Sequence, residues 1–380
     1  MKSTPIVFLF NSPLQSGCDY VVQTMRIIGT TNPTYGLALG DIIWFPKLFT
    51  ERRPWVSRRI EGAVILRPVS IIPGVRFRPV RILAYLLQAV LIRIFVAIRH
   101  PKLPKVLWFF EPFHIPPLLH IFSDYTSLYD CVDYYPGFNP GARAEHRACM
   151  DTASYVIANS KPLAAMLRRI RSDVVSVPLG SSTSLFKNYR ISPLPPKKEN
   201  VTVGYIGGIS SRIDFSLLAT VIQRLPRVRF LFVGPPESNV FGKSDHSLHA
   251  MRILSAYHNV EWIQGVPKKD IPAVLSRVDI GIVPYRSNLS FNRYSFPMKV
   301  MEYFACGKPV VSTDIYSLRG YTDAQILAIA STPETFAREI RLIQRNGWQE
   351  SKQKKQVSIA ISMSWQEKIK AIMTATSLNT

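Results

Sequence analysis

Lys299 and Glu302 are the strongest candidates for chemistry in this sequence. Their spacing places both side chains on one face of a helix predicted over about residues 298–305, which Pro297 begins and Gly307 ends. A cation in the first turn of a helix opposes the helix dipole, so Lys299 is better explained by an anionic ligand. Glu302 lies one turn further on and can accept hydrogen bonds from ribose hydroxyls. The plain alternative is a surface Lys–Glu pair, which would contribute only about 0.3–0.5 kcal/mol.

A glycine pair, Gly207 and Gly208, follows an apolar strand predicted over residues 201–206 and precedes a helix predicted over 215–224. Glycine lets the backbone approach a phosphate closely, and the following helix offers free N–H groups at its positive end. A tight turn with no ligand is an equally good explanation. The spacing matches neither GxGxxG nor the P-loop, which disfavours an NAD enzyme or a P-loop ATPase.

Acidic residues follow strands in the first half of the chain. Glu111 follows a strand predicted over 106–110, and Asp130 and Asp133 follow another over 127–129. Loops after parallel strands open toward the ligand, so each carboxylate could take the proton of an attacking hydroxyl. We rank Asp133 first and Glu111 second, whereas His114 fits a structural role. For each acid the alternative is a helix cap or a surface charge.

The order of predicted elements indicates an α/β protein with two domains. Strands and helices alternate with short loops, which is the signature of parallel βαβ units. Residues 191–200 contain three prolines and two lysines, a composition typical of a linker. The chain has 380 residues, of which 47% are apolar and 19% charged, so each half can bury a core. None of the four cysteines forms a CxxC pair, and neither zinc nor a disulfide framework is expected.

The net charge of +22 needs a partner or a surface to explain it. Residues 47–105 hold 13 Lys or Arg and two acids around an apolar helix predicted over 80–98. This helix is either buried, or lies at an anionic membrane surface, or, least plausibly, serves nucleic acid, for which no motif is present. We expect no secretory signal and no transmembrane helix, because the N-terminal apolar run is short and no long uncharged window occurs.

Resemblance to a known family rests on segments in chain order, which read LYDCVDYYPGF, ASYVIANSKPLAAML, VGYIGGISSRIDFSLL, VDIGIVPYRSN and SFPMKVMEYFACGKPVVSTD. Together they resemble GT-B glycosyltransferases, and are most similar to a bacterial branch that builds polysaccharides and cell-wall glycans. The resemblance implies two Rossmann-like domains facing a central cleft. Residues 1–190 would bind the acceptor, 191–200 would form the linker, and 201–380 would bind the donor, with the last helix crossing back to the first domain.

The resemblance also implies roles for donor-binding residues. Gly207 and Gly208 would lie against the diphosphate, Lys299 would neutralise it, Glu302 would hold the ribose, and Tyr285 would lie near the base or the sugar. Arg212 and helix dipoles would add positive potential. No acidic DxD run occurs, so no metal or other cofactor is expected beyond a UDP- or GDP-sugar as co-substrate. Retaining relatives carry a further Glu where this chain has Tyr294, which leaves the stereochemistry open.

We therefore expect an enzyme that moves a sugar to a lipid-linked or polymeric glycan acceptor in polysaccharide biosynthesis. We expect it to be cytoplasmic, held peripherally on the cytoplasmic face of a membrane, with no nucleic-acid partner. Two alternatives remain open. One is a GT-B-type nucleotide-sugar epimerase, which would need no basic membrane face. The other is a non-catalytic sugar-nucleotide or glycan-binding protein, against which the Lys299 and Glu302 pair argues.

Overall fold

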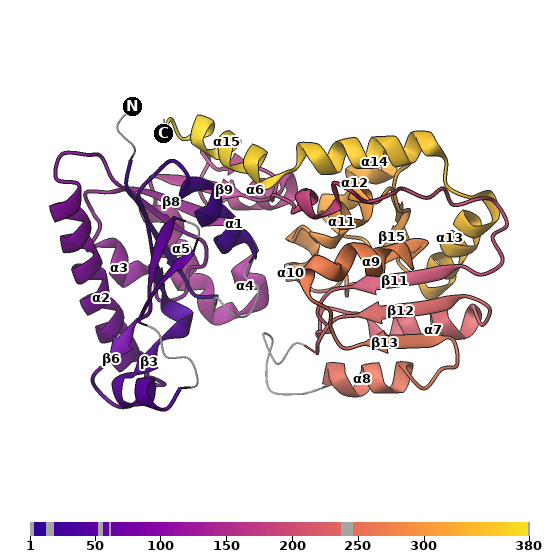
Figure 1. The fold of residues 1–380 in the computed structure, drawn as a ribbon, viewed down its shortest axis with the longest axis horizontal. Coiled ribbons are helices and arrows are strands. Elements are labelled where there is room, and N and C mark those ends of the chain that lie inside the picture. Colours follow the sequence, from indigo (N-terminus) through magenta and orange to yellow (C-terminus); the bar gives the residue numbers. More distant parts are fainter. Residues whose placement is uncertain (1–3, 13–18, 52–55, 61, 237–245, 379–380) are drawn as a thin grey trace. The chain divides into compact units, whose positions relative to one another are not determined.

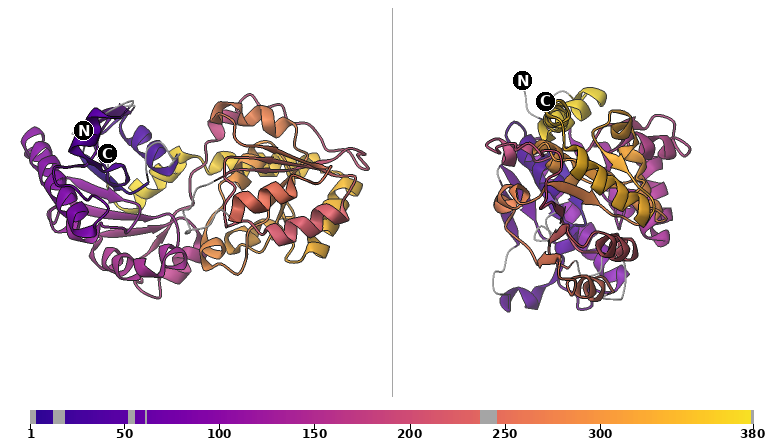
Figure 2. Two further views of the ribbon diagram at one scale, coloured as in Figure 1. Left: turned by 90° about the horizontal axis from the view of Figure 1, so that it is seen from below. Right: turned by 90° about the vertical axis from the view of Figure 1, so that its right-hand side faces the viewer.

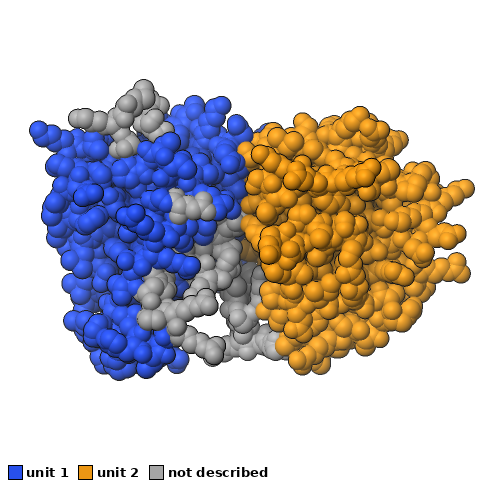
Figure 3. Space-filling model, in the orientation of Figure 1, with its two compact units in different colours: residues 1–180, 365–380 blue, residues 181–364 orange. Residues whose placement is uncertain are grey.

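The computed structural model describes residues 4–12, 19–51, 56–60, 62–236 and 246–378. The predicted loop at 13–17 and Cys18 lie outside these ranges. The chain divides into two compact units, residues 1–180 with 365–380 and residues 181–364 (Figure 3).

Unit 1 is built on an eight-stranded sheet with the order β10-β9-β8-β7-β1-β2-β5-β4, parallel except for the β4–β5 pair. Strands β1 and β7 are apolar and fully buried, and β8 is almost fully buried, as expected when helices cover both faces of a parallel sheet. The strands are β1 (Ile6–Phe10), β2 (Thr34–Ala38), β4 (Ser57–Ile60), β5 (Ala63–Leu66), β7 (Val106–Phe109), β8 (Thr126–Cys131), β9 (Tyr155–Ala158) and β10 (Val175–Ser176), with β3 (Ile43–Trp44) and β6 (Val69–Ser70) pairing separately.

Helices surround this sheet (Figures 1 and 2). They are α1 (Asp19–Ile28), α2 (Arg78–Arg99), α3 (Pro116–Leu119), α4 (Tyr135–Phe138), α5 (Arg143–Thr152), α6 (Lys161–Leu167) and α15 (Trp365–Ala375). The chain end returns to unit 1, because α15 packs against α1.

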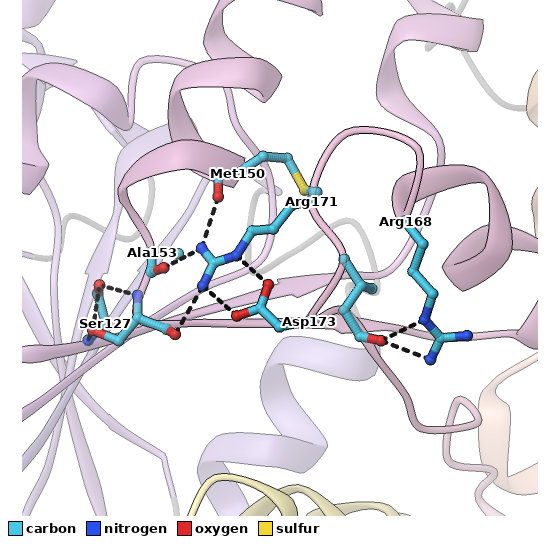
Figure 4. Close-up of polar contacts among 8 residues, drawn as sticks. Ser127, Met150, Ala153, Arg168, Arg171 and Asp173 are labelled. Carbon is cyan, nitrogen blue, oxygen red and sulfur yellow. Dashed lines mark hydrogen bonds and ion pairs between the residues drawn. The ribbon is translucent and has the colours of Figure 1, made fainter.

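Arg171 ties the end of α5 to the start of β9 (Figure 4). Its guanidinium donates to the carbonyls of Met150, Ala153 and Ser154 and to the carboxylate of Asp173. One planar cation thereby satisfies backbone acceptors that the helix leaves without partners at its C-terminus. The clamp fixes the spacing of α5 and β9 at the edge of the sheet opposite the candidate acids, and we assign it a structural role.

Unit 2 contains a six-stranded parallel sheet with the order β13-β12-β11-β14-β15-β16. In chain order this is 3-2-1-4-5-6, the order of the Rossmann fold. The strands are β11 (Thr202–Ile206), β12 (Arg229–Val233), β13 (Val260–Ile263), β14 (Ile280–Val283), β15 (Val310–Ser312) and β16 (Ala328–Ile329). The helices are α7 (Phe215–Arg224), α8 (His246–Leu254), α9 (Ile271–Ser276), α10 (Ser290–Tyr294), α11 (Lys299–Ala305), α12 (Arg319–Asp323), α13 (Pro333–Asn346) and α14 (Glu350–Ser362).

The Pro-rich segment at 191–200 packs within unit 2, and the unit begins at Ser181, ten residues before the predicted linker. Leu194 is buried and bridges to Trp348, whose N–H donates to the Leu194 carbonyl. Prolines restrict this segment to extended backbone, and here the extended backbone is used for packing. The composition that suggested a spacer therefore marks an ordered segment of unit 2.

Helix α2 has two apolar faces, and only one of them is buried. Buried side chains recur at a helical spacing, namely Ala84, Tyr85, Ala89, Ile92 and Val96. The other face exposes Leu83, Leu87, Val90, Leu91, Ile94, Phe95 and Ile98, with exposed fractions of 42–76%. Among the described residues this is the one helix long and apolar enough to cross a membrane by length and composition alone. We expected no transmembrane helix because no long uncharged window occurs, and by composition alone α2 does not support that exclusion.

Candidate functional site

The candidate donor residues of unit 2 lie at the point of its sheet where the strand order reverses. The chain runs from β11 outward to β12 and β13, then returns to place β14 on the other side of β11. Loops after β11 and β14 therefore diverge at the carboxyl edge of the sheet and leave a crevice, the usual ligand site of such folds. Gly207, Gly208 and Arg212 follow β11, and Tyr285 follows β14.

Lys299 is the first residue of α11 and is only 9% exposed. Its Nζ lies 3.6 Å from the centre of the Tyr205 ring and 4.9 Å from that of Tyr285. The glycine loop fits closely around it. A Cβ added at Gly207, whose φ is +142°, would lie 2.7 Å from this Nζ. Glycine at 207 therefore lets the backbone and the ammonium share one small space, in which an anion would meet both.

Tyr285 lies against two cations. The Arg212 guanidinium carbon is 4.5 Å from the centre of its ring, comparable to the distance from Lys299. Burial raises the pKa of the Tyr285 phenol, but the charges of Lys299 and Arg212 outweigh burial and lower that pKa below its ordinary value. The local potential is thus strongly positive, as a site for a diphosphate requires.

The helix that follows the glycine loop does not present an open N-terminus. Asp214 caps α7 by accepting a hydrogen bond from the N–H of Leu217 at 3.0 Å. Asp214 thus takes one of the N–H groups that this helix was expected to offer beside the glycine pair, and its carboxylate partly matches the positive end of the helix. Positive charge at this edge comes from Lys299 and Arg212.

Glu302 lies one turn after Lys299 on α11 and is half-buried. The position where retaining relatives carry a further Glu is held by Tyr294. Its ring packs edge-on against Tyr316, with ring centres 5.5 Å apart. An aromatic contact has thus taken the place of a carboxylate there.

The switch point of unit 1 lies between β1 and β7, and Glu111 sits across it. Its carboxylate accepts hydrogen bonds from the backbone N–H groups of Asn11 and Ser12, from the Ser12 hydroxyl and from the Tyr20 hydroxyl. Glu111 is 3% exposed. Burial, followed by the charge of Glu111, holds the pKa of Tyr20 well above its ordinary value. A carboxylate with four donors is committed to holding the loop after β1, which weakens its case as a base.

Asp130 and Asp133 have different environments although they are three residues apart. Asp130 is fully buried in β8, and the Nζ of Lys368 lies 2.7 and 3.0 Å from its two carboxylate oxygens. We therefore withdraw Asp130 as a candidate base, because both oxygens are occupied and no solvent reaches them. Asp133 lies beyond the strand end and is half-buried. Its negative charge contributes to raising the pKa of Tyr20 and Tyr135, which places it in the same cluster as Glu111.

His114 has a structural environment, in agreement with its sequence context. Its φ is +61°, its N–H donates to Glu145, and its Nε2 lies 3.2 Å from a guanidinium nitrogen of Arg81. Burial lowers the pKa of its imidazole. Arg78 also pairs with Glu145, so this network joins the first turn of α2 to α5.

Among the residues that the structure describes, no group of three or more His, Cys, Asp or Glu side chains is placed to hold a metal ion. Cys131, Cys149 and Cys306 are buried free thiols. Metal independence remains a prediction.

Comparison with known proteins identifies the second unit. Residues 200–346 match the model of the family described as "Glycosyl transferases group 1". This segment is similar to group 1 glycosyl transferase domains. The chain is also 29% identical over 230 residues to TuaH of Bacillus subtilis (strain 168), which is named as a teichuronic acid biosynthesis glycosyltransferase. That match covers 56% of this chain and 56% of TuaH, so it spans little more than half of the relative.

Solved structures match nearly the whole chain at low sequence identity. Sucrose-phosphate synthase of Thermosynechococcus elongatus has a TM-score of 0.71 at 13% identity and covers 99% of this chain and 98% of its own. A glycosyltransferase of Rickettsia africae has a TM-score of 0.70 at 12% identity, with coverage of 100% and 99%. Anabaena HepE, solved with UDP and glucose, has a TM-score of 0.66 at 15% identity, with 99% of both chains covered. These likenesses confirm the GT-B fold with two Rossmann-like halves.

The segment that matches the family model contains every candidate donor residue, from Gly207 to Glu302. Sequence reasoning missed several residues that hold this site and the acid cluster, namely Tyr20, Tyr205, Asn292 and Lys368. Asn292 and Lys368 are polar residues buried to 3% exposure or less. Their only signal in the sequence is a polar residue at an apolar position of a helix, which by itself does not name the partner.

Proposed function

We propose that this protein transfers a sugar from a nucleoside-diphosphate sugar to a lipid-linked or polymeric glycan acceptor in polysaccharide biosynthesis. The observation that carries the proposal is the pair of cations, Lys299 and Arg212, held against Tyr285 at a Rossmann switch point. This cluster lies within a segment that matches the group 1 glycosyl transferases. The HepE structures, solved with UDP and with UDP-glucose, support a nucleoside-diphosphate carrier, for which UDP and GDP are the candidates.

Donor binding would use the charges and the close backbone approach of this edge. Lys299 and Arg212 neutralise the diphosphate, and the chain at Gly207 and Gly208 passes beside it. Phosphate leaves with additional negative charge as the bond to the sugar breaks, so fixed cations stabilise the transition state more than the bound donor. Glu302 accepts hydrogen bonds from the ribose hydroxyls.

Acceptor activation would use Asp133. In an inverting transfer its carboxylate takes the proton of the acceptor hydroxyl while that oxygen bonds to the anomeric carbon, and the nucleoside diphosphate leaves with the electrons of the broken bond. Asp133 is the best-suited of the three acids because it lies outside β8 and is half-buried. Glu111 would position the loop at Asn11 and Ser12 beside it.

A thermal-shift series of UDP-, GDP- and TDP-sugars tests the donor site. At least one should raise the melting temperature of the wild type, and Lys299→Ala should abolish that increase. Lys308→Ala is the matched control, because Lys308 is buried in the same segment and burial lowers its pKa, yet it faces Tyr189. It should lower the melting temperature of the free protein and keep the ligand-induced increase. No increase with any nucleotide sugar would refute the proposed donor.

The same proposal places the enzyme on the cytoplasmic face of a membrane, through the exposed face of α2. Seven apolar side chains on that face are 42–76% exposed, and each CH₂ removed from water contributes about 0.8 kcal/mol. Basic residues flank the helix, and each contributes about 1 kcal/mol near an anionic leaflet. The first turn of α2 lies beside the loop after β7, because Arg81 contacts His114, so docking through α2 would bring the acid cluster close to a lipid-linked acceptor.

Vesicle flotation tests this docking. The protein should float with phosphatidylglycerol-containing vesicles, and less in high salt, because exposed charges are screened beyond about 8 Å. Leu87→Gln with Leu91→Gln should abolish flotation. Ile253→Gln with Ile361→Gln is the matched control, since both are exposed apolar residues of unit 2. Flotation that survives alkaline carbonate would instead indicate a membrane span, and none with either lipid would remove the membrane from the proposal.

A further inference from the structure

Arg212 reaches the donor site in a fixed orientation. Its guanidinium lies over two rings, 4.5 Å from the centre of Tyr285 and 4.8 Å from that of Phe291. Its Nε donates to Oδ1 of Asn292 at 2.9 Å. The two terminal nitrogens make no hydrogen bond or ion pair to any residue of the described ranges. A planar guanidinium held at one edge thus presents its other edge, the one that can bind a phosphate with two parallel hydrogen bonds.

Asn292 is completely buried, and both ends of its amide are used. Besides accepting from Arg212, it donates through Nδ2 to the Arg212 carbonyl at 3.2 Å and to the Arg286 carbonyl at 2.9 Å. One side chain therefore fixes the backbone and the guanidinium of Arg212 together. Because Arg212 follows β11 and Arg286 follows β14, Asn292 also joins the two loops that form the switch-point crevice. A backbone hydrogen bond from the Arg286 N–H to the Arg212 carbonyl joins the same two loops.

We infer that Asn292 is a positioning residue for nucleotide diphosphate binding, acting through Arg212. A flexible arginine loses side-chain rotamer freedom when a ligand fixes it, and a pre-positioned one has already lost it. Asn292 supplies that fixation. It lies on α10, two residues before Tyr294.

The inference rests on the proposed donor site, and a double-mutant cycle tests the two separately. The probes are UDP and GDP, titrated calorimetrically, with uridine and guanosine as controls that lack phosphate. Arg212→Gln should weaken binding of the preferred diphosphate at least tenfold, the effect of one lost charge-assisted contact. Asn292→Ala should weaken it severalfold in the wild type but have no further effect in Arg212→Gln. Neither variant should change binding of the nucleoside.

A matched control separates positioning from loss of stability. Asn259 also donates its side-chain amide to two backbone carbonyls of unit 2, those of Leu225 and Val228, on the far side of β12 from Arg212. Asn259→Ala should destabilise the protein and leave diphosphate binding unchanged. If wild type binds neither UDP nor GDP, the donor site itself is wrong. If it binds one and Arg212→Gln weakens it, but Asn292→Ala has no effect or adds independently, the role of Asn292 is refuted.

Discussion

Replacing Lys368 by methionine should destabilise unit 1 by about 3–5 kcal/mol. The ammonium of Lys368 and the carboxylate of Asp130 are 1% and 0% exposed, with N–O distances of 2.7 and 3.0 Å. Methionine retains the length and apolar stem of lysine and removes only the charge. Asp130 would then be left as a buried carboxylate without its cation, at a position in the middle of the sheet that water cannot reach.

The size of the effect follows from this geometry. An ion pair that is fully removed from water is costly to form, but removing one partner leaves the other uncompensated, which is the larger penalty. Whole domains are stable by about 5–15 kcal/mol, so the single variant should lose a large part of that stability. Asp130→Leu combined with Lys368→Met removes both charges and should recover most of the loss. The cycle therefore yields a coupling energy for the pair.

Urea unfolding followed by circular dichroism measures each variant, with limited proteolysis beyond Ser364 reporting whether α15 has detached from unit 1. Lys354→Met is the matched control, because Lys354 pairs with Glu350 on the surface of α14 and should be replaceable with little change. A loss below 1 kcal/mol for Lys368→Met, or a double variant no more stable than the single one, would refute the reasoning.

Four further results are expected. Lys299→Ala should weaken donor binding by about 1.5–3 kcal/mol, and Glu302→Gln should weaken it without unfolding; unchanged turnover at subsaturating donor in both would contradict the assignment. Asp133→Asn should reduce transfer by roughly 10²–10⁴-fold at constant donor affinity, whereas a change below threefold would exclude it as the base. Activity should persist in excess EDTA, and loss restored by Mn²⁺ would show a metal requirement. Burial lowers the pKa of His146 to about 4, so its stabilising contribution of about 3 kcal/mol is complete above pH 6.5 and is lost as the pH falls toward 4; urea titrations of His146→Gln should lack this dependence.

The fold could be predicted from the sequence to a large extent, because its strands are continuous apolar runs. The runs around Val7, Leu107 and Val203 are too short for helices and end at loop residues, which predicts buried parallel strands. Domain boundaries were harder to predict. The prolines at 193–196 favour extended backbone, and only the tertiary contact between Leu194 and Trp348 shows that this backbone is packed.

The sequence predicts the position of a candidate site residue where that residue follows the end of a strand. It does not predict the orientation of a side chain that is held by a partner far away in the sequence. Lys299 and Gly207 come together because two loops meet at the switch point between β11 and β14. The fixation of Arg212 depends on Asn292, eighty residues away, and no local pattern reveals it. The open helix N-terminus was a reasonable expectation from spacing, and Asp214 takes one of its N–H groups through a single carboxylate.

Asp130 and Asp133 illustrate how a strand end separates a structural acid from a functional candidate. Strand β8 ends at Cys131, so Asp130 belongs to a run that is buried on both faces, and Asp133 belongs to the loop beyond it. A carboxylate inside such a run requires a cation, and the sheet itself offers none, so the partner must come from a distant segment. Lys368 on α15 supplies it. The same pairing that removes Asp130 from the candidate bases anchors the end of the chain to unit 1, so the proposed role of base passes to Asp133 in the loop beyond the strand.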